Sequence, residues 1–92
     1  MFVQLKYPQE IAMETAEREK KKRKRRGLTQ KELAERCGVS LASLKRFEQT
    51  GEISFVSLIK IAAVLDETHN FAKLFTAEEY LSIQEVIDER NY

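Results

Sequence analysis

The sequence predicts an all-α protein of about five or six helices. A helix start signal occurs four times: an apolar residue precedes a Ser or Thr cap, and a second apolar residue follows the cap by four positions. The chain has 1 Pro and 3 Gly, and 9% of its residues are aromatic, which is unlike a turn-rich β fold. A chain of 92 residues forms one domain with one modest hydrophobic core.

The first predicted helix begins at Pro8, which suits a first-turn position, and runs to about Arg26. Its apolar stripe ends near Glu19, where a run of seven consecutive cations, KKKRKRR, begins. Beyond that point only aliphatic stems, such as those of Lys20 and Arg23, can cover the core. We therefore expect the cations to form the last two turns of this helix, where they also suit the negative end of its dipole.

The cap signals predict four more helices, and each cap is worth about 1 kcal/mol. The first signal is the most complete, because Thr29 and Glu32 have the spacing of a capping box. A short helix is also expected at His69–Phe75. The four capped helices begin near Gln30, Leu41, Phe55 and Ala77.

The second and third predicted helices form the most specific pattern in the chain. Gly38 ends the first of them, since Gly adopts the positive φ of a helix C-terminus at little cost. So short a connection makes the helices cross steeply, and Ala34 supplies the small side chain at their contact. Burial of Leu44 and Phe47 then turns the opposite face of the later helix outward, as in a helix-turn-helix. That outward face comprises Ser40, Leu41, Ala42, Ser43, Lys45, Arg46 and Gln49.

The segment RRGLTQKELAERCGVSLASLKRFEQTGEISFVSLIKIAAVLD resembles the phage-repressor-like (XRE-type) helix-turn-helix domain of many small bacterial transcription regulators. This resemblance implies a compact lambda-repressor-like fold in a single domain over residues 1–92, with residues 9–66 as the DNA-binding core. The matching positions are Leu28–Gln30, Glu32–Ala34, Gly38–Ser40, Leu44, Phe47, Glu48 and Gly51.

The resemblance also implies which side chains contact DNA. Leu41, Ala42 and Arg46 would lie nearest the base edges, with Lys45 beside them. Arg46 can pair with guanine, and an apolar side chain can meet a thymine methyl group. Several relatives carry Gln at the positions of Leu41 and Ala42, so readout here shifts towards Arg46, backbone contacts and DNA shape. The predicted DNA-binding residues are Arg23, Lys24, Arg26, Thr29, Gln30, Ser40, Leu41, Ala42, Ser43, Lys45, Arg46 and Thr50.

Residues in three parts of the chain are predicted to contact phosphates. Thr29 and Gln30 lie at a helix N-terminus, where amides and the dipole favour an anion, although Thr29 can equally be a simple cap. Thr50 follows the DNA-facing helix. The cations of Arg23–Arg26, including Arg25, are separated from Thr29 only by Gly27 and Leu28, so some of them would contact or steer the DNA backbone. A solvated face or a nuclear-targeting signal are the alternatives for this run.

Formal charge is divided between the two halves of the chain. Residues 1–46 hold 13 Lys and Arg against 6 Asp and Glu, whereas residues 47–92 hold 3 against 9. The halves therefore carry net charges of +7 and −6 within a total of +1. Such a division favours a polyanion partner, double-stranded DNA, for the first half. Two solvated faces of opposite sign are the alternative.

Several function classes are disfavoured. A single cysteine, Cys37, excludes a disulfide framework and a cysteine-based zinc cluster, and its inner-face position suits a small buried hydrophobe. His69 has no carboxylate or cysteine in helical register for a catalytic pair, so we expect no enzyme, metal or cofactor. No apolar run reaches the roughly 18 residues of a membrane helix, and no secretory signal is present. We expect a cytoplasmic, nucleoid-associated protein.

Residues 67–92 are predicted to be a helical extension with a dimer or partner surface. The large apolar side chains there are too many for a free tail, and a two-fold dimer would bury them while reading two DNA half-sites. KYPQEIA, SLKRFEQTGEIS and FAKLF with YLSIQEVI also resemble the HipB-like regulators found beside HipA-type kinase toxins. The apolar side chains are Phe71, Leu74, Phe75, Tyr80, Leu81, Ile83, Val86 and Ile87.

The sequence thus predicts a sequence-specific, DNA-binding transcription regulator that acts as a dimeric autorepressor on a palindromic operator. The finer resemblance implies an alternative, an antitoxin-type interaction module that inhibits a HipA-like kinase toxin, with DNA binding secondary. Neither function involves catalysis by this chain.

Overall fold

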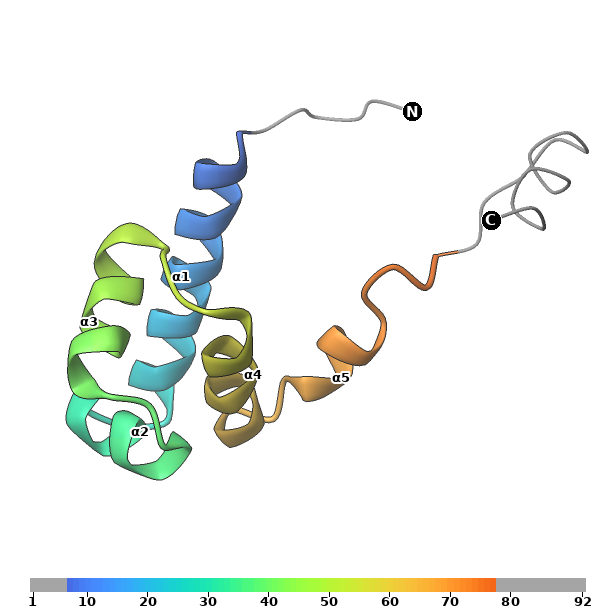
Figure 1. The fold of residues 1–92 in the computed structure, drawn as a ribbon. Helices are drawn as coiled ribbons and strands as arrows, with labels where there is room; N and C mark the ends of the chain where they lie inside the picture. Colours follow the sequence, from blue (N-terminus) through green and yellow to red (C-terminus); the bar gives the residue numbers. More distant parts are fainter. Residues whose placement is uncertain (1–6, 78–92) are drawn as a thin grey trace, which may run out of the picture.

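A computed structural model describes residues 7–77, and that part of the chain contains helices but no strand (Figure 1). The all-α prediction is confirmed, and the helix predicted to begin near Ala77 lies outside the described residues. Within residues 7–77 no helix combines the length and apolar character needed to cross a bilayer. The helices are α1 (Pro8–Arg25), α2 (Gln30–Cys37), α3 (Leu41–Thr50), α4 (Phe55–Val64) and α5 (Thr68–Ala72).

Side-chain caps fix the starts of α2, α3 and α4. The Thr29 hydroxyl accepts from the Glu32 amide and the Glu32 carboxylate accepts from the Thr29 amide, both at 3.1 Å. This capping box also lowers the pKa of Glu32, chiefly through the bond from the Thr29 backbone. Ser40 and Ser54 cap α3 and α4 in the same way, each accepting from the amide three residues further on. All three predicted starts are confirmed. The weaker prediction, His69–Phe75, corresponds to a five-residue helix without a side-chain cap.

Glycines end both α2 and α3, for reasons that differ. Gly38 and Gly51 have φ values of 72° and 79°, a conformation that residues with a Cβ atom rarely adopt. At Gly38 a Cβ atom would meet nothing within 4 Å. At Gly51 it would lie 2.8 Å from the carbonyl carbon of Ala12, so α1 and α3 touch backbone to backbone here.

The hydrophobic core lies between α1, α2, α3 and α4. Leu33, Leu44, Phe47 and Ile61 are its largest fully buried side chains, which confirms the predicted inner faces of α2, α3 and α4. Cys37 is half-buried and packs against this core, broadly as predicted. The buried apolar residues are Ala16, Leu28, Leu33, Ala34, Val39, Leu44, Phe47, Ile61, Ala62 and Leu65.

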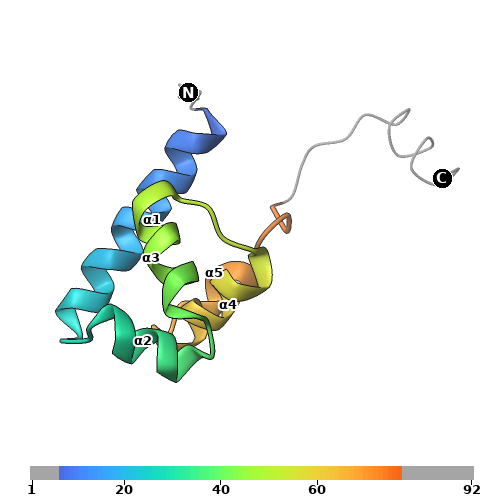
Figure 2. The same ribbon diagram turned by 60° about the vertical axis from the view of Figure 1, so that its left-hand side comes forward.

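The helices pack so that α3 is supported from two sides. α1 lies along α3, and α2 packs on both α3 and α4 (Figures 1 and 2). α2 crosses the base of α3 at a steep angle, as the short connection at Gly38 requires (Figure 2). α5 packs on α4 and extends away from the other helices (Figure 1). The side of α3 that faces away from α1, α2 and α4 therefore remains open.

Candidate nucleic-acid interface

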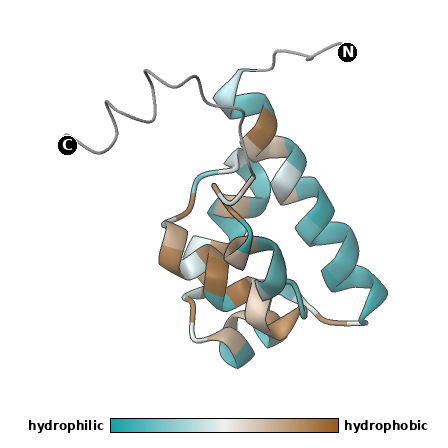
Figure 3. Cartoon of the chain, turned by 90° about the vertical axis from the view of Figure 1, so that its right-hand side faces the viewer, coloured by the Kyte–Doolittle hydropathy of each residue, from teal (hydrophilic) through white to brown (hydrophobic). Residues whose placement is uncertain are grey.

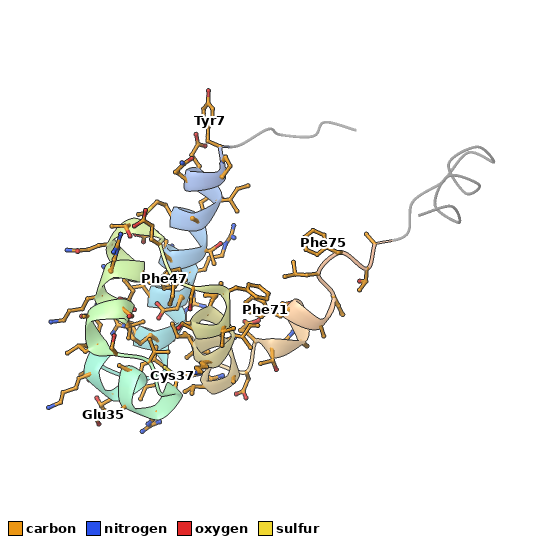
Figure 4. The ribbon with its side chains drawn as sticks, in the orientation of Figure 1. Tyr7, Glu35, Cys37, Phe47, Phe71 and Phe75 are labelled. Atoms are coloured by element: carbon orange, nitrogen blue, oxygen red, sulfur yellow. The ribbon has the colours of Figure 1, made fainter. Side chains whose placement is uncertain are left out.

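The open face of α3 is polar and cationic. Leu44 and Phe47 point into the core, and Phe47 is seen between the helices in Figure 4. Their burial fixes the rotation of α3, so the side chains on the other side of the helix are exposed, as predicted. The exposed residues of this face are Ser40, Ala42, Ser43, Lys45, Arg46 and Gln49.

Leu41 departs from the prediction for this face. It was expected to be exposed near the base edges, but it is half-buried and packs against the core cluster. It lies in the first turn of α3, where the chain arrives from the buried Val39. The apolar side chain that is fully available at this end of α3 is therefore Ala42, which is exposed.

Arg46 is exposed but engaged with a neighbouring acid. Its side chain is 69% exposed, and its guanidinium donates to the Glu52 carboxylate at 2.5 and 3.1 Å. An exposed pair of this kind contributes at most about 1 kcal/mol, so another acceptor can replace Glu52. Thr50 lies between the two, since its hydroxyl donates to the Arg46 carbonyl and accepts from the Glu52 amide. Arg46 is thus held at the surface by Glu52 and can exchange this partner for another acceptor.

Arg23 requires a correction to the predicted phosphate contacts. Its side chain is buried, and its guanidinium donates two 2.8 Å bonds to the Glu48 carboxylate and one 2.9 Å bond to the Leu28 carbonyl. No part of this guanidinium faces solvent in a way that could meet a phosphate. Glu48 belongs to the residues that carry the family resemblance, but its pairing with Arg23 was not predicted from the sequence. The spacing of Ala16, Glu19 and Arg23 along the buried stripe of α1 is the signal that points to it.

Arg26 is also used within the protein. It donates to the carbonyls of Val64 and Leu65 at 3.1 and 3.2 Å and to the Asp66 carboxylate at 3.0 Å. A cation here suits the exposed carbonyls at the end of α4 and fastens the end of α1 to them. Lys24 and Arg25, in contrast, are exposed. Figure 3 shows that the C-terminal half of α1 is hydrophilic.

The start of α2 contributes one internal contact and one cap. Gln30 is half-buried, and its amide donates to the Glu48 carboxylate at 3.1 Å. The Thr29 hydroxyl serves the capping box, so the cap interpretation of Thr29 is confirmed, and its contact with DNA stays a prediction. The Glu48 carboxylate therefore joins α1, α2 and α3 through bonds from Arg23 and Gln30.

The electrostatics of this junction are set by hydrogen bonding. Burial alone would raise the pKa of Glu48, but the hydrogen bonds from Arg23 and Gln30, together with the neighbouring Glu19 carboxyl group, hold it below its usual value. The bond with Glu48 in turn raises the pKa of Arg23. Both groups are charged near neutral pH, which makes the pair a charged, buried support directly beneath the open face of α3.

Comparison with known proteins agrees with this geometry. A family model described as Helix-turn-helix matches residues 20–71, which is 52 of the 92 residues. The matched span begins at the cationic half of α1, contains α2, α3 and α4, and ends within α5. A search of curated proteins finds no match to the chain.

Proposed function

Because this chain belongs to the XRE-type helix-turn-helix family, whose model covers more than half of it, we propose that it is a sequence-specific autorepressor that binds a palindromic operator as a homodimer. Membership of this family of DNA-binding, non-enzymatic domains already makes it a DNA-binding transcriptional regulator. Beyond this membership, we propose that binding is sequence-specific, that it represses the protein's own gene, that the operator is palindromic and that the protein binds as a dimer. Its DNA-binding core is residues 9–66, and residues 67–92 form the extension that serves assembly.

The exposed face of α3 carries this proposal. α3 is the recognition helix, and a major groove about 12 Å wide admits it with the N-terminal turns foremost. Arg46 leaves Glu52 and pairs with a guanine, while the Ala42 methyl meets a thymine methyl. Lys45 binds either a base or a phosphate. Ser40 and Ser43, at the N-terminal cap of α3, contact the DNA backbone or base edges.

Phosphate contacts then follow from the elements beside α3. Lys24 is our first candidate, together with Arg25, because both are exposed at the end of α1. The N-terminus of α2 at Thr29 and Gln30 supplies amides and a dipole, which favour a phosphate. Thr50 and Arg26 are further candidates, and the bonds of Arg26 to the end of α4 limit its reach. Each phosphate neutralised steepens the dependence of log K on log salt concentration by about 0.9.

Arg46→Ala tests the recognition helix directly. We expect it to weaken binding to the DNA upstream of the gene by about 1–3 kcal/mol, because it removes one bidentate base contact. Arg18→Ala is the matched control: it makes the same change in charge, and Arg18 lines the groove between α1, α4 and α5, away from the open face of α3. Gel-shift titration measures both, with circular dichroism to check the fold. Equal affinities for the two variants would rule out the role of Arg46.

The dimer contact is proposed for an apolar surface formed by Phe55, Val56, Leu74 and Phe75, here called the α4–α5 apolar surface. All four side chains are exposed, Phe75 completely so. The ring of Phe55 also makes an edge contact with that of Phe71, with centroids 5.7 Å apart, which links α4 to α5. In Figure 4 Phe71 reaches α4 whereas Phe75 points away from the helices. Large apolar side chains that are left exposed are typical of a protein–protein contact.

The backbone at Phe75 supports the same assignment. Its φ is 62°, and bulky side chains rarely adopt this left-handed conformation. Strain of this kind persists where function requires a residue to be presented in a given direction. We therefore place Phe75 at the centre of the dimer contact.

The antitoxin alternative would use the same surface for a different partner. An apolar surface fits a kinase as well as it fits a second copy, so the chemistry alone favours neither. Co-purification with the product of a neighbouring kinase-like gene would favour the antitoxin. Self-association at micromolar concentration without such a partner would favour the dimer.

A further inference from the structure

Glu19 lies in α1 with its carboxyl group inside the protein. Its side chain is nearly buried, at 8% exposure. Among the residues that the structure describes, neither of its oxygens has a hydrogen-bond partner. A buried carboxylate without hydrogen bonds is costly, and native structures rarely tolerate one. The charge state of Glu19 therefore needs an explanation.

The surroundings of Glu19 hold too few cations to neutralise it. Glu48 from α3 and Arg23 from α1 are the charged groups that act on it, and Arg23 already donates two bonds to Glu48. Two carboxyl groups thus share one guanidinium. On its other side Glu19 lines a groove of about 350 Å³ between α1, α4 and α5, whose walls from α4 are apolar. The charged side chains of that groove are Arg18, Lys22 and Glu67, and Lys22 is paired with Glu67.

A proton on Glu19 resolves the imbalance. Burial raises the pKa of Glu19 to about 8, and the neighbouring Glu48 carboxylate acts in the same direction, both as an acceptor for a proton held by Glu19 and through its negative charge, against the smaller effect of Arg23. Two carboxylates can only accept hydrogen bonds, so while both are ionised no bond forms between them. Once protonated, Glu19 has an O–H that can donate to the Glu48 carboxylate. Glu48 keeps its charge because its pKa is lowered.

We propose that Glu19 is a proton-binding positioning residue behind the recognition helix: the neutral form donates a hydrogen bond to Glu48 and holds α3 against α1, and loss of the proton to solvent loosens this contact and weakens DNA binding. The coupling has a short path. Glu48 lies two residues after Arg46 on α3 and also accepts from Gln30 at the first position of α2. A negative charge on Glu19, beside the charged Glu48, therefore destabilises the junction where α1, α2 and α3 meet. The DNA part of this inference rests on the proposed function.

The sign of the pH dependence follows from proton binding. In the unfolded chain Glu19 has its ordinary pKa of 4.5, and in the folded protein about 8. Between these values the folded state holds a proton that the unfolded state has lost. The stabilisation is fully present below pH 4.5 and is lost as the pH rises to about 8. Above that pH this group causes no further change in the free energy of unfolding, because both states have lost the proton.

Glu19→Gln tests the proposal, because Gln keeps the size, is permanently neutral and can donate an N–H to Glu48. Glu17→Gln is the matched control, since Glu17 is exposed on the same helix and the change in charge is identical. Urea unfolding midpoints of the full chain are measured across the window from pH 4.5 to above 8. We expect wild type and Glu17→Gln to lose stability in parallel, and Glu19→Gln to lose less and to be the most stable of the three at the alkaline end. Parallel profiles for all three proteins would overturn the proton site.

Gel shifts at constant salt with the upstream DNA test the coupling. We expect the affinity of wild type and of Glu17→Gln to fall above pH 8, by at most about tenfold per pH unit for one proton, while Glu19→Gln stays level. An equal fall in all three would overturn the link to α3. Absence of wild-type binding at every pH would overturn the proposed function instead, and the unfolding profiles would still decide the proton site.

Discussion

The α1–α3 junction buries charged side chains, whereas the α4–α5 apolar surface exposes large hydrophobic ones. In the junction Arg23 and Glu48 are 6% exposed, and each has partners within the chain. On the apolar surface Phe75 is completely exposed and Val56 is 62% exposed. The charged groups of the junction therefore find their partners within one chain. The apolar surface, in contrast, is available for contact with another chain.

This difference separates two tasks. A buried ion pair contributes little net stability, because removal of its charges from water offsets their attraction. It does, however, allow only one arrangement of the helices that carry it, and here those helices are α1, α2 and α3. An exposed apolar surface imposes no such arrangement. It contributes to stability only when another surface covers it and removes it from water. We infer that the junction fixes the shape of the DNA-binding face, and that the apolar surface governs assembly.

Arg23→Ala is expected to have the largest effect on the junction. It leaves the charged Glu48 carboxylate buried without a cation, which lowers the free energy of unfolding by about 3–5 kcal/mol. Arg25→Ala is the control, because Arg25 is exposed two residues away in the same cationic run and should change stability by at most about 0.5 kcal/mol. Urea denaturation measures both. Similar small losses would mean that the pair does not support the fold.

Gly51→Ala is expected to come next. At both Gly51 and Gly38 an added Cβ atom must adopt a positive φ, at a cost of roughly 1–2 kcal/mol. At Gly51 the Cβ atom also meets the backbone of Ala12 at 2.8 Å, and overpacking of this kind adds about 1–3 kcal/mol. Thermal unfolding should therefore show a larger loss for Gly51→Ala than for Gly38→Ala. An equal loss would indicate that α1 and α3 separate readily at this point.

The sequence predicted the parts of the molecule that local chemistry determines. Caps at Thr29, Ser40 and Ser54 act on amides three residues away, so the helix starts could be read directly. The inner faces of α2, α3 and α4 followed from periodicity. The exposed face of α3 was predicted for the same reason, apart from Leu41, whose first-turn position lets it fold back onto the core.

The sequence could not separate the members of the cationic run, because neighbouring cations are locally alike. Arg23 is distinguished by Glu48, 25 residues further on, and Arg26 by the end of α4, at least 38 residues further on. Such partners are known only once the helices are placed. For the candidate site we therefore propose the phosphate-contacting role for the exposed neighbours Lys24 and Arg25 in place of the buried Arg23.

Phe75→Asn is expected to have the smallest effect on folding. It is also the clearest test of the difference between the α1–α3 junction and the α4–α5 apolar surface. Phe75 is completely exposed, so its loss removes no packing within the chain, and Asn tolerates the φ of 62° better than Phe does. Unfolding of the monomer should change by at most about 0.5 kcal/mol. If Phe75 is an anchor of the dimer, self-association should weaken by about 2 kcal/mol or more.

Sedimentation velocity across the micromolar range measures this loss, and Lys73→Asn is the control from the same exposed segment. The control should associate as wild type does, since Lys73 adds a charge rather than apolar area to its surroundings. A large fall in the unfolding free energy of Phe75→Asn would place Phe75 in the fold of a single chain, and unchanged association would place the dimer contact elsewhere. Loss of association with folding intact would show that the two regions are separable: the junction builds the DNA-binding face of one chain, and the apolar surface sets the spacing between two.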